Sequence, residues 1–156
     1  MSKIKILAMD VDGTLTDGKI YVGAQGEVMK AFNVKDGYGI AQLLPKMSIT
    51  PVIITGRKSE IVSRRAEELK INNVYQGVND KLTKLSEIAF EFGVTLENVA
   101  YIGDDLNDIE CIEHCGLTAC PSDSINEVLR MVDYICPSCG GDGAVREFIE
   151  YISEMN

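Results

Sequence analysis

Residues 4–18 read IKILAMDVDGTLTDG and give the clearest indication of the fold. The first six residues form a near-continuous apolar run with a single lysine, which is typical of a strand covered on both faces of a parallel sheet. Asp10 and Asp12 come directly after the run. Because open α/β sheets place their ligand sites at the carboxyl ends of the strands, the stretch predicts a buried strand that leads into a site rich in carboxylates.

Short apolar runs alternate with amphipathic segments along the rest of the chain. The runs lie at 51–55, 73–76, 99–103, 117–120 and 133–136, and apolar residues at helical spacing mark the segments 61–69, 82–92 and 145–152. This alternation predicts right-handed βαβ crossovers and an α/β fold with a doubly wound, Rossmann-like parallel sheet. One stretch differs, because residues 19–22 and 27–32 are β-like on either side of Gly-Ala-Gln-Gly at 23–26, which predicts a projecting β-hairpin with a four-residue loop.

Length and charge narrow the function classes. With 156 residues the chain predicts one domain, 1–156, that includes the hairpin at about 19–32. Fifteen basic against twenty-four acidic side chains give a net charge of −9, which disfavours nucleic acid and anionic membranes as partners. No apolar run approaches the ~20 residues of a membrane helix, and Asp10 interrupts the N-terminal segment before a signal-peptide core is complete. We therefore expect a cytoplasmic protein.

Polar residues follow the predicted strands in a coherent set. They are Asp10-Val11-Asp12-Gly13-Thr14, Thr55-Gly56-Arg57, Lys81, and Gly103-Asp104-Asp105 with Asn107 and Asp108. Clustered carboxylates repel one another unless a cation neutralises them, and all-oxygen ligands select a hard ion such as Mg²⁺. With a lysine, a hydroxyl and backbone N–H groups, such an ion makes a site for a phosphoryl dianion, and an aspartate can attack phosphorus.

Two other interpretations explain parts of this set of residues. Asp and Gly at strand ends are common turn formers, but turns require no Thr and Lys at matching strand ends. A two-component receiver domain also combines an Asp cluster, a Thr and a Lys. Its Lys lies near the last strand, whereas Lys81 here precedes the Gly103-Asp104-Asp105 segment. The order of the residues therefore disfavours a receiver.

The motifs DVDGTLTDG, Thr55, Lys81 and GDDLND resemble, in the same order, the four motifs of the haloacid dehalogenase-like phosphohydrolases. The resemblance implies that Asp10 is the nucleophile and Asp12 the general acid and base. It implies that Thr55 and Lys81 hold phosphoryl oxygens. By the same resemblance, Mg²⁺ is bound by Asp10, the backbone carbonyl of Asp12 and Asp104, with Asp105 and Asp108 nearby.

A narrower resemblance points to a branch without a cap domain. Only forty-two residues separate Asp12 from Thr55 and twenty-five separate Thr55 from Lys81, which leaves no room for a cap. FNVKDGYGI (32–40), TGRKSEIVSRRAEELK (55–70), YQGVNDKL (75–82) and GGDGAVREF (140–148) resemble the capless branch that hydrolyses 8- and 9-phosphates of keto sugar acids. This resemblance implies a homotetramer assembled through the hairpins, in which one subunit completes a neighbour's site.

The same resemblance suggests the substrate contacts and the substrate. The residues expected to bind the substrate are Asp12, Asn33, Lys35, Asp36, Gly37, Gly56, Arg57, Arg65, Lys81 and Asn107. Arg57 and Arg65 are expected to contact the sugar-acid carboxylate, because the arginine fork suits a carboxylate; for Arg65 a solvated helix face beside Glu68 is the alternative. We expect a Mg²⁺-dependent phosphatase acting on 3-deoxy-D-manno-octulosonate 8-phosphate. The alternatives are a nine-carbon, sialic-acid-type 9-phosphate as substrate, or a non-catalytic phosphatase-like assembly module.

Overall fold

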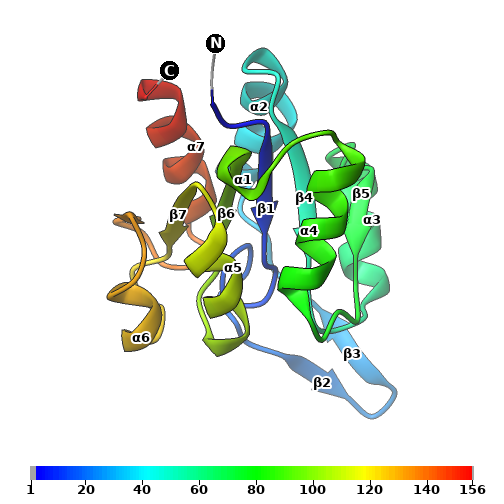
Figure 1. Ribbon diagram of the computed structural model, residues 1–156. Helices are drawn as coiled ribbons and strands as arrows, with labels where there is room; N and C mark the ends of the chain where they lie inside the picture. Colours follow the sequence, from blue (N-terminus) through cyan, green and yellow to red (C-terminus); the bar gives the residue numbers. More distant parts are fainter. Residues whose placement is uncertain (1–2, 156) are drawn as a thin grey trace.

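The computed structural model describes residues 3–155 as strands and helices in regular alternation (Figure 1). The strands are β1 (Ile6–Met9), β2 (Tyr21–Gly23), β3 (Gly26–Met29), β4 (Thr50–Ile54), β5 (Asn73–Tyr75), β6 (Val99–Ile102), β7 (Leu117–Cys120) and β8 (Tyr134–Ile135). The helices are α1 (Val34–Tyr38), η1 (Gly39–Leu43), α2 (Leu44–Lys46), α3 (Glu60–Glu68), α4 (Lys81–Glu91), η2 (Leu96–Asn98), η3 (Leu106–Asp108), α5 (Ile109–His114), α6 (Asn126–Leu129) and α7 (Ala144–Glu154).

Six strands form one parallel sheet in the order β5-β4-β1-β6-β7-β8. From β1 the chain first moves outward through β4 and β5, and then returns to the other side of β1 and continues through β6, β7 and β8. The strand order therefore reverses between β1 and β6, which is the point where open α/β sheets bind ligands. This arrangement confirms the predicted doubly wound, Rossmann-like parallel sheet.

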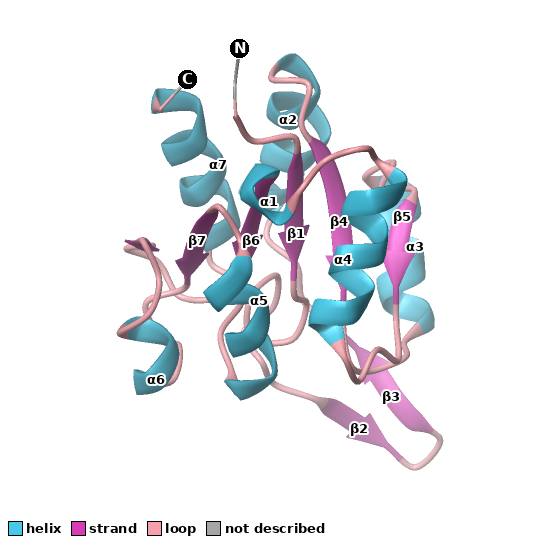
Figure 2. Cartoon of the chain, in the orientation of Figure 1, coloured by secondary structure: helices cyan, strands magenta, loops and turns pink. Residues whose placement is uncertain are grey.

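Two cores lie on opposite faces of the sheet, because successive strand residues point to opposite sides. Leu7 and Met9 of β1 pack with side chains of α3 and α7 in one core. Ile6 and Ala8 pack with α4, α5 and α6 in the other. Figure 2 shows the helices on both sides of the magenta strands. Burial on both faces explains why β1 is apolar throughout.

The hairpin lies below the carboxyl ends of the strands in Figure 1. Strands β2 and β3 pair as far as Gly23 opposite Gly26, so the turn consists of Ala24 and Gln25. The predicted four-residue loop is therefore wrong: both glycines belong to the strands, and Gly26 has a φ of +110°, a conformation that glycine adopts without strain. The segments between β1 and β4 and between β4 and β5 hold only this hairpin and the helices given above, in agreement with the predicted absence of a cap domain.

Residues 34–46 form consecutive helical turns, with a π turn at η1, that the hydrophobic pattern did not indicate. Two glycines weaken the helical pattern there. A Cβ at Gly37 would lie 2.6 Å from Arg65 Nη2, and one at Gly39 would lie 2.9 Å from Ile149 Cδ1. The glycines therefore allow this segment to pack closely against α3 and α7.

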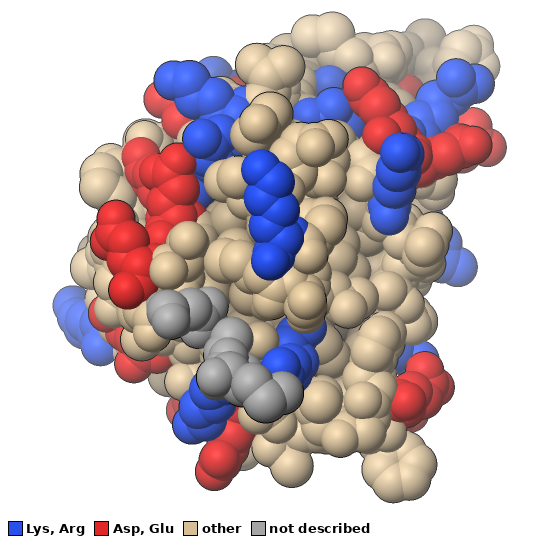
Figure 3. All heavy atoms as spheres, turned by 90° about the horizontal axis from the view of Figure 1, so that it is seen from above, with Lys and Arg blue, Asp and Glu red and all other residues tan. Residues whose placement is uncertain are grey.

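The end of the molecule where β1 begins is seen in Figure 3. Basic and acidic side chains are interspersed around its rim, as on an ordinary solvated surface. Of the helices in residues 3–155, none has the length and apolar character needed to cross a bilayer.

Candidate active site

Three neighbouring strands and one helix place three of the predicted catalytic residues, Asp10, Thr55 and Lys81, at one edge of the sheet with the predicted metal ligand Asp104. Asp10 follows β1, Thr55 follows β4 and Asp104 comes two residues after β6, while Lys81 is the first residue of α4. Because β4, β1 and β6 are adjacent and parallel, their carboxyl ends meet at one edge of the sheet. The Asp10 N–H donates to the Ile102 carbonyl at 3.1 Å, which fixes the end of β1 against β6.

Lys81 ties two of the carboxylates at this edge together. Its buried ammonium donates to Asp10 Oδ1 at 2.9 Å and to Asp108 Oδ1 at 2.8 Å. The Tyr101 hydroxyl also donates to Asp108 Oδ1, at 2.5 Å. The N–H groups of Asp104 and Asp105 donate to Asp108 Oδ2, at 2.9 and 3.2 Å. The Asp108 carboxylate therefore accepts from four donors and fixes the position of Lys81 and of the backbone at Asp104.

Asp104 approaches the site because the residues opposite it are small. Thr14 Oγ1 donates to Asp104 Oδ1 at 3.1 Å. A Cβ at Gly13, whose φ is +90°, would lie 1.9 Å from Asp104 Oδ2. Only glycine can therefore stand at this position while Asp104 keeps its place. One carboxylate oxygen each of Asp10, Asp104 and Asp108 then lie within 4.8 Å of one another.

The electrostatics of these three carboxylates favour the binding of a cation. Burial and the Asp108 carboxylate raise the pKa of Asp10 to about 6, although Lys81 opposes the rise. Burial and the Asp10 charge raise the pKa of Asp104 to about 8. Burial lowers the pKa of Lys81, but Asp10 and Asp108 raise it by more, so the ammonium stays charged. Within residues 3–155, Lys81 is the cation seen in ion pairs with this trio, so a hard divalent cation on Asp10 and Asp104 fits the donor set and the charge.

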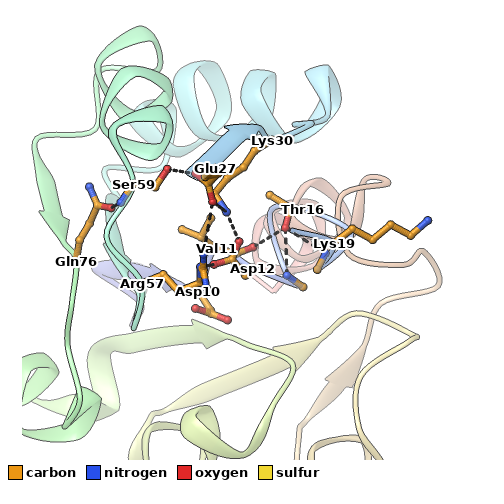
Figure 4. A network of polar contacts seen from close by, with 12 residues as sticks. Asp10, Val11, Asp12, Thr16, Lys19, Glu27, Lys30, Arg57, Ser59 and Gln76 are labelled. Atoms are coloured by element: carbon orange, nitrogen blue, oxygen red, sulfur yellow. Dashed lines mark hydrogen bonds and ion pairs between the residues drawn. The ribbon is translucent and has the colours of Figure 1, made fainter. Parts of the chain in front are cut away.

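The carboxyl group of Asp12 points away from that of Asp10 (Figure 4). Its Oδ1 accepts from Lys30 Nζ at 2.6 Å, and its Oδ2 lies 3.9 Å from Arg57 Nε. Lys30 comes directly after β3, so the hairpin reaches back to the loop that follows β1. Two neighbouring carboxylates, Asp10 and Asp12, thus have separate surroundings, as an acid–base residue beside a nucleophile requires.

Comparisons with known proteins agree with this geometry. A model of the haloacid dehalogenase-like hydrolase family matches residues 69–149. The 3-deoxy-D-manno-octulosonate 8-phosphate phosphatase of Escherichia coli is 44% identical over 149 residues, which cover 96% of this chain and 79% of that protein. The same enzyme from Yersinia pestis is 43% identical over 151 residues, 97% of this chain and 80% of the relative. The chain belongs to the haloacid dehalogenase-like hydrolases.

Solved structures of similar hydrolases match this fold closely. The 3-deoxy-D-manno-octulosonate 8-phosphate phosphatase of Moraxella catarrhalis, in complex with a magnesium ion, a phosphate ion and a KDO molecule, has a TM-score of 0.93. It is 43% identical, and the match covers 98% of this chain and 87% of that one. The cobalt-bound Haemophilus influenzae phosphatase has a TM-score of 0.94 at 37% identity, covering 98% and 89%.

In this haloacid dehalogenase-like hydrolase, some predicted substrate residues lie at the site and others do not. Gly56 and Arg57 follow Thr55 at the end of β4, and the Asn107 amide is 3.8 Å from where a Gly56 Cβ would be. The Arg57 side chain is 54% exposed and makes only long contacts to Asp12 and Glu27, so it can turn toward a ligand.

The residues around α1 have other partners. Arg65 donates to Glu68 at 3.1 Å and to the Asn33 carbonyl at 3.4 Å, and it stacks on Phe32. Asp36 is buried and accepts from the Arg146 N–H at 2.9 Å. With Gly37, the side chains of Arg65 and Asp36 line a cavity of about 10 Å³, the room of one water molecule. The structure thus places Arg65 and Asp36 in the packing of α1 against α3 and α7, while Lys35 is exposed beside them.

Sequence reasoning missed several residues of the site. Tyr101 and Lys30 were not singled out, and Asp108 was given only a supporting place. Tyr101 is hidden in the apolar run of β6, and Lys30 lies in a β-like run where a lysine is ordinarily solvated. The sequence held no signal for either residue, because their roles come from contacts between distant segments.

Proposed function

We propose that this chain is a phosphomonoesterase that hydrolyses 3-deoxy-D-manno-octulosonate 8-phosphate to the free sugar acid and phosphate. The observation that carries the proposal is the Moraxella catarrhalis enzyme, whose structure contains a magnesium ion, a phosphate ion and a KDO molecule at 43% identity to this chain. The site at the edge of the sheet offers a matching group for each: carboxylates for a cation, Lys81 and Thr55 for a phosphoryl group, and Arg57 for a carboxylate.

Asp10 is the proposed nucleophile. Lys81 holds its Oδ1, so the other oxygen is available to attack phosphorus. A bond then forms between Asp10 and phosphorus as the bond from phosphorus to the sugar oxygen breaks, and Asp12 gives that oxygen its proton. Asp12 next takes a proton from the water that cleaves the aspartyl-phosphate, which restores Asp10 and releases phosphate.

Other groups of the chain prepare the site for a dianionic substrate. The buried side chain of Thr55 and the ammonium of Lys81 are proposed to hold the phosphoryl oxygens. Mg²⁺, held by Asp10, Asp104 and the backbone carbonyl of Asp12, would supply charge that offsets the repulsion between Asp10 and the phosphoryl group. Arg57 is proposed to read the substrate carboxylate, since its fork is exposed and loosely held.

The hairpin is proposed to join copies of the chain into a homotetramer. Val22 and Val28 are 70% and 60% exposed, and Tyr21 and Met29 are 36% and 51% exposed, so the hairpin presents an apolar surface. Light scattering on the wild type should give four chains per particle, and Val28→Asp should give smaller particles. A monodisperse monomer at micromolar concentration would contradict the tetramer.

Phosphate release with Mg²⁺ from four substrates tests the activity. The panel is octulosonate 8-phosphate, a nonulosonate 9-phosphate, a hexose 6-phosphate and an aryl phosphate. We expect kcat/KM to favour the octulosonate by about 100-fold or more, since unpaired polar groups reject the wrong substrate strongly. Asp10→Asn serves as the inactive control. Equal rates on all four substrates would overturn the substrate, and no release that depends on Asp10 would overturn the phosphatase.

A further inference from the structure

A lysine of the hairpin lies against the proposed acid–base residue. Lys30 Nζ is 2.6 Å from Asp12 Oδ1 and 3.0 Å from Glu27 Oε2, and its side chain is only 1% exposed. Burying an ammonium is costly unless carboxylates compensate its charge, and here two carboxylates do so. This long side chain is therefore held in one place between Asp12 and Glu27.

Glu27 is itself held by residues that precede α3 and follow β5. The Ser59 hydroxyl donates to Glu27 Oε1 at 2.5 Å, and the Ser59 N–H donates to Gln76 Oε1 at 2.7 Å. Gln76 in turn donates to Ser63 Oγ of α3 at 2.8 Å. Figure 4 shows this chain of contacts running from Gln76 through Ser59 and Glu27 to Lys30 and Asp12. Lys30 is thus anchored to the α3 side of the sheet.

The two oxygens of Asp12 have unequal partners. Oδ1 accepts the short hydrogen bond from Lys30, whereas Oδ2 has only the guanidinium of Arg57 at 3.9 Å. Arg57 Nη2 also lies 3.8 Å from Glu27 Oε2, so Asp12, Lys30, Glu27 and Arg57 form a closed ring of contacts. Lys30 fixes the rotation of the Asp12 carboxyl through one oxygen and leaves the other free to carry a proton.

We propose that Lys30 is a positioning residue for the proton transfers of Asp12, and that Glu27 holds Lys30 in place. The inference rests on the proposed phosphatase activity and extends it to the hairpin. In this proposal Lys30 does not bind the substrate directly, because its ammonium is covered and two of its three N–H donors are engaged. It also predicts that loss of Lys30 has little effect once Asp12 has lost its function.

The leaving group provides a readout that a merely structural role would not change. A sugar alkoxide needs a proton as it departs, whereas 4-nitrophenolate departs without one. General acid–base catalysis contributes about 10²–10⁴-fold, and a misoriented acid loses part of that. Lys30→Met should therefore lower kcat on the sugar phosphate about 10- to 100-fold with KM nearly unchanged, while the initial burst of nitrophenolate falls less than about threefold.

The experiment compares wild type, Lys30→Met, Lys30→Arg, Asp12→Asn and the double variant Asp12→Asn/Lys30→Met. Lys30→Arg, which keeps the charge, should recover part of kcat. The double variant should be no slower than Asp12→Asn alone, because residues that act as one unit are not additive. Lys19→Met is the matched control, since Lys19 is an exposed lysine at the start of the same hairpin and its side chain points away from Asp12 (Figure 4).

Each outcome decides the inference. With an active wild type, three results would overturn the inference. They are equal falls in kcat on the sugar phosphate and in the nitrophenolate burst, a rise in KM alone, and a lower kcat in the double variant than in Asp12→Asn. A wild type with no activity on any phosphate would overturn the proposed function and this inference together. If Lys30→Met does not fold by circular dichroism, Glu27→Gln replaces it, and a smaller loss confined to the sugar phosphate is then expected.

Discussion

Removing one charge from the carboxylate trio is expected to stabilise the cation-free protein at high pH. The perturbation is Asp104→Asn, which keeps an oxygen to accept from Thr14 and removes a carboxylate within 4.8 Å of those of Asp10 and Asp108. Burial and the charge of Asp10 raise the pKa of Asp104 from 3.8 to about 8 in the folded protein. The folded protein therefore resists ionisation of this group far more than the unfolded chain does.

The sign follows from proton binding. Between about pH 4 and pH 8 the folded state holds a proton that the unfolded chain has released, so the free energy of unfolding falls as the pH rises. At about 1.4 kcal/mol per pH unit, the full shift of Asp104 from 3.8 to about 8 would amount to about 6 kcal/mol. Asp10 and Asp104 share one repulsion and Asp104 is partly exposed, so we expect about half of that, roughly 2–3 kcal/mol.

Urea denaturation in the presence of a chelator, followed by circular dichroism at pH 5 and pH 8, measures the effect. From pH 5 to pH 8, the free energy of unfolding of the wild type should fall by roughly 2–3 kcal/mol relative to that of Asp104→Asn. Mg²⁺ should restore the stability of the wild type, because the ion binds only the folded protein. Asp105→Asn is the matched control, since Asp105 is exposed and an asparagine caps η3 equally well. The reasoning is refuted if the difference between wild type and Asp104→Asn is the same at both pH values.

Three further substitutions test the carboxylate trio, the approach of Asp104 to Gly13, and the buried carboxyl of Asp36. Asp108→Asn should lower the free energy of unfolding at pH 7 by about 3 kcal/mol, because it sets an amide against buried donors that include Lys81; a loss below about 1 kcal/mol in urea titration would contradict this. Gly13→Ala should abolish Mg²⁺ binding in calorimetry, because its Cβ would displace Asp104, and an unchanged affinity would show that Asp104 does not hold the ion. Burial raises the pKa of Asp36 to about 6. As the pH rises from 4 to 7, the free energy of unfolding of Asp36→Asn should therefore increase by about 1–2 kcal/mol relative to that of the wild type. Equal pH dependence of the two proteins in urea denaturation would contradict this.

The predicted fold depended on local patterns that the sequence contains. Alternation of apolar runs with helical spacing indicated the parallel sheet, since a strand buried on both faces must be apolar throughout. The hydrophobic pattern did not delimit the helical segment 34–46, because Gly37 and Gly39 are poor helix formers and only their close contacts with α3 and α7 explain them. The hairpin turn was placed two residues too wide, because its glycines read as loop residues.

Local sequence patterns were sufficient to predict the kind of chemistry at the site. Asp10, Thr55, Lys81 and Asp104 stand at the ends of strands or the start of a helix, and adjacency of parallel strands brings such positions to one edge. Local sequence was enough here, because each residue is placed by its own element and the elements follow from periodicity.

The contacts that hold these residues in place arise from tertiary packing and could not be predicted from local patterns. Asp108 meets Lys81 across 27 residues of sequence, and Lys30 meets Asp12 across 18. Asp36 accepts from the backbone N–H of Arg146, 110 residues away. Side chains of these types are ordinarily solvated, so sequence gives them no partner. Their pairing depends on where the hairpin and α7 pack, and packing is set by the whole core at once.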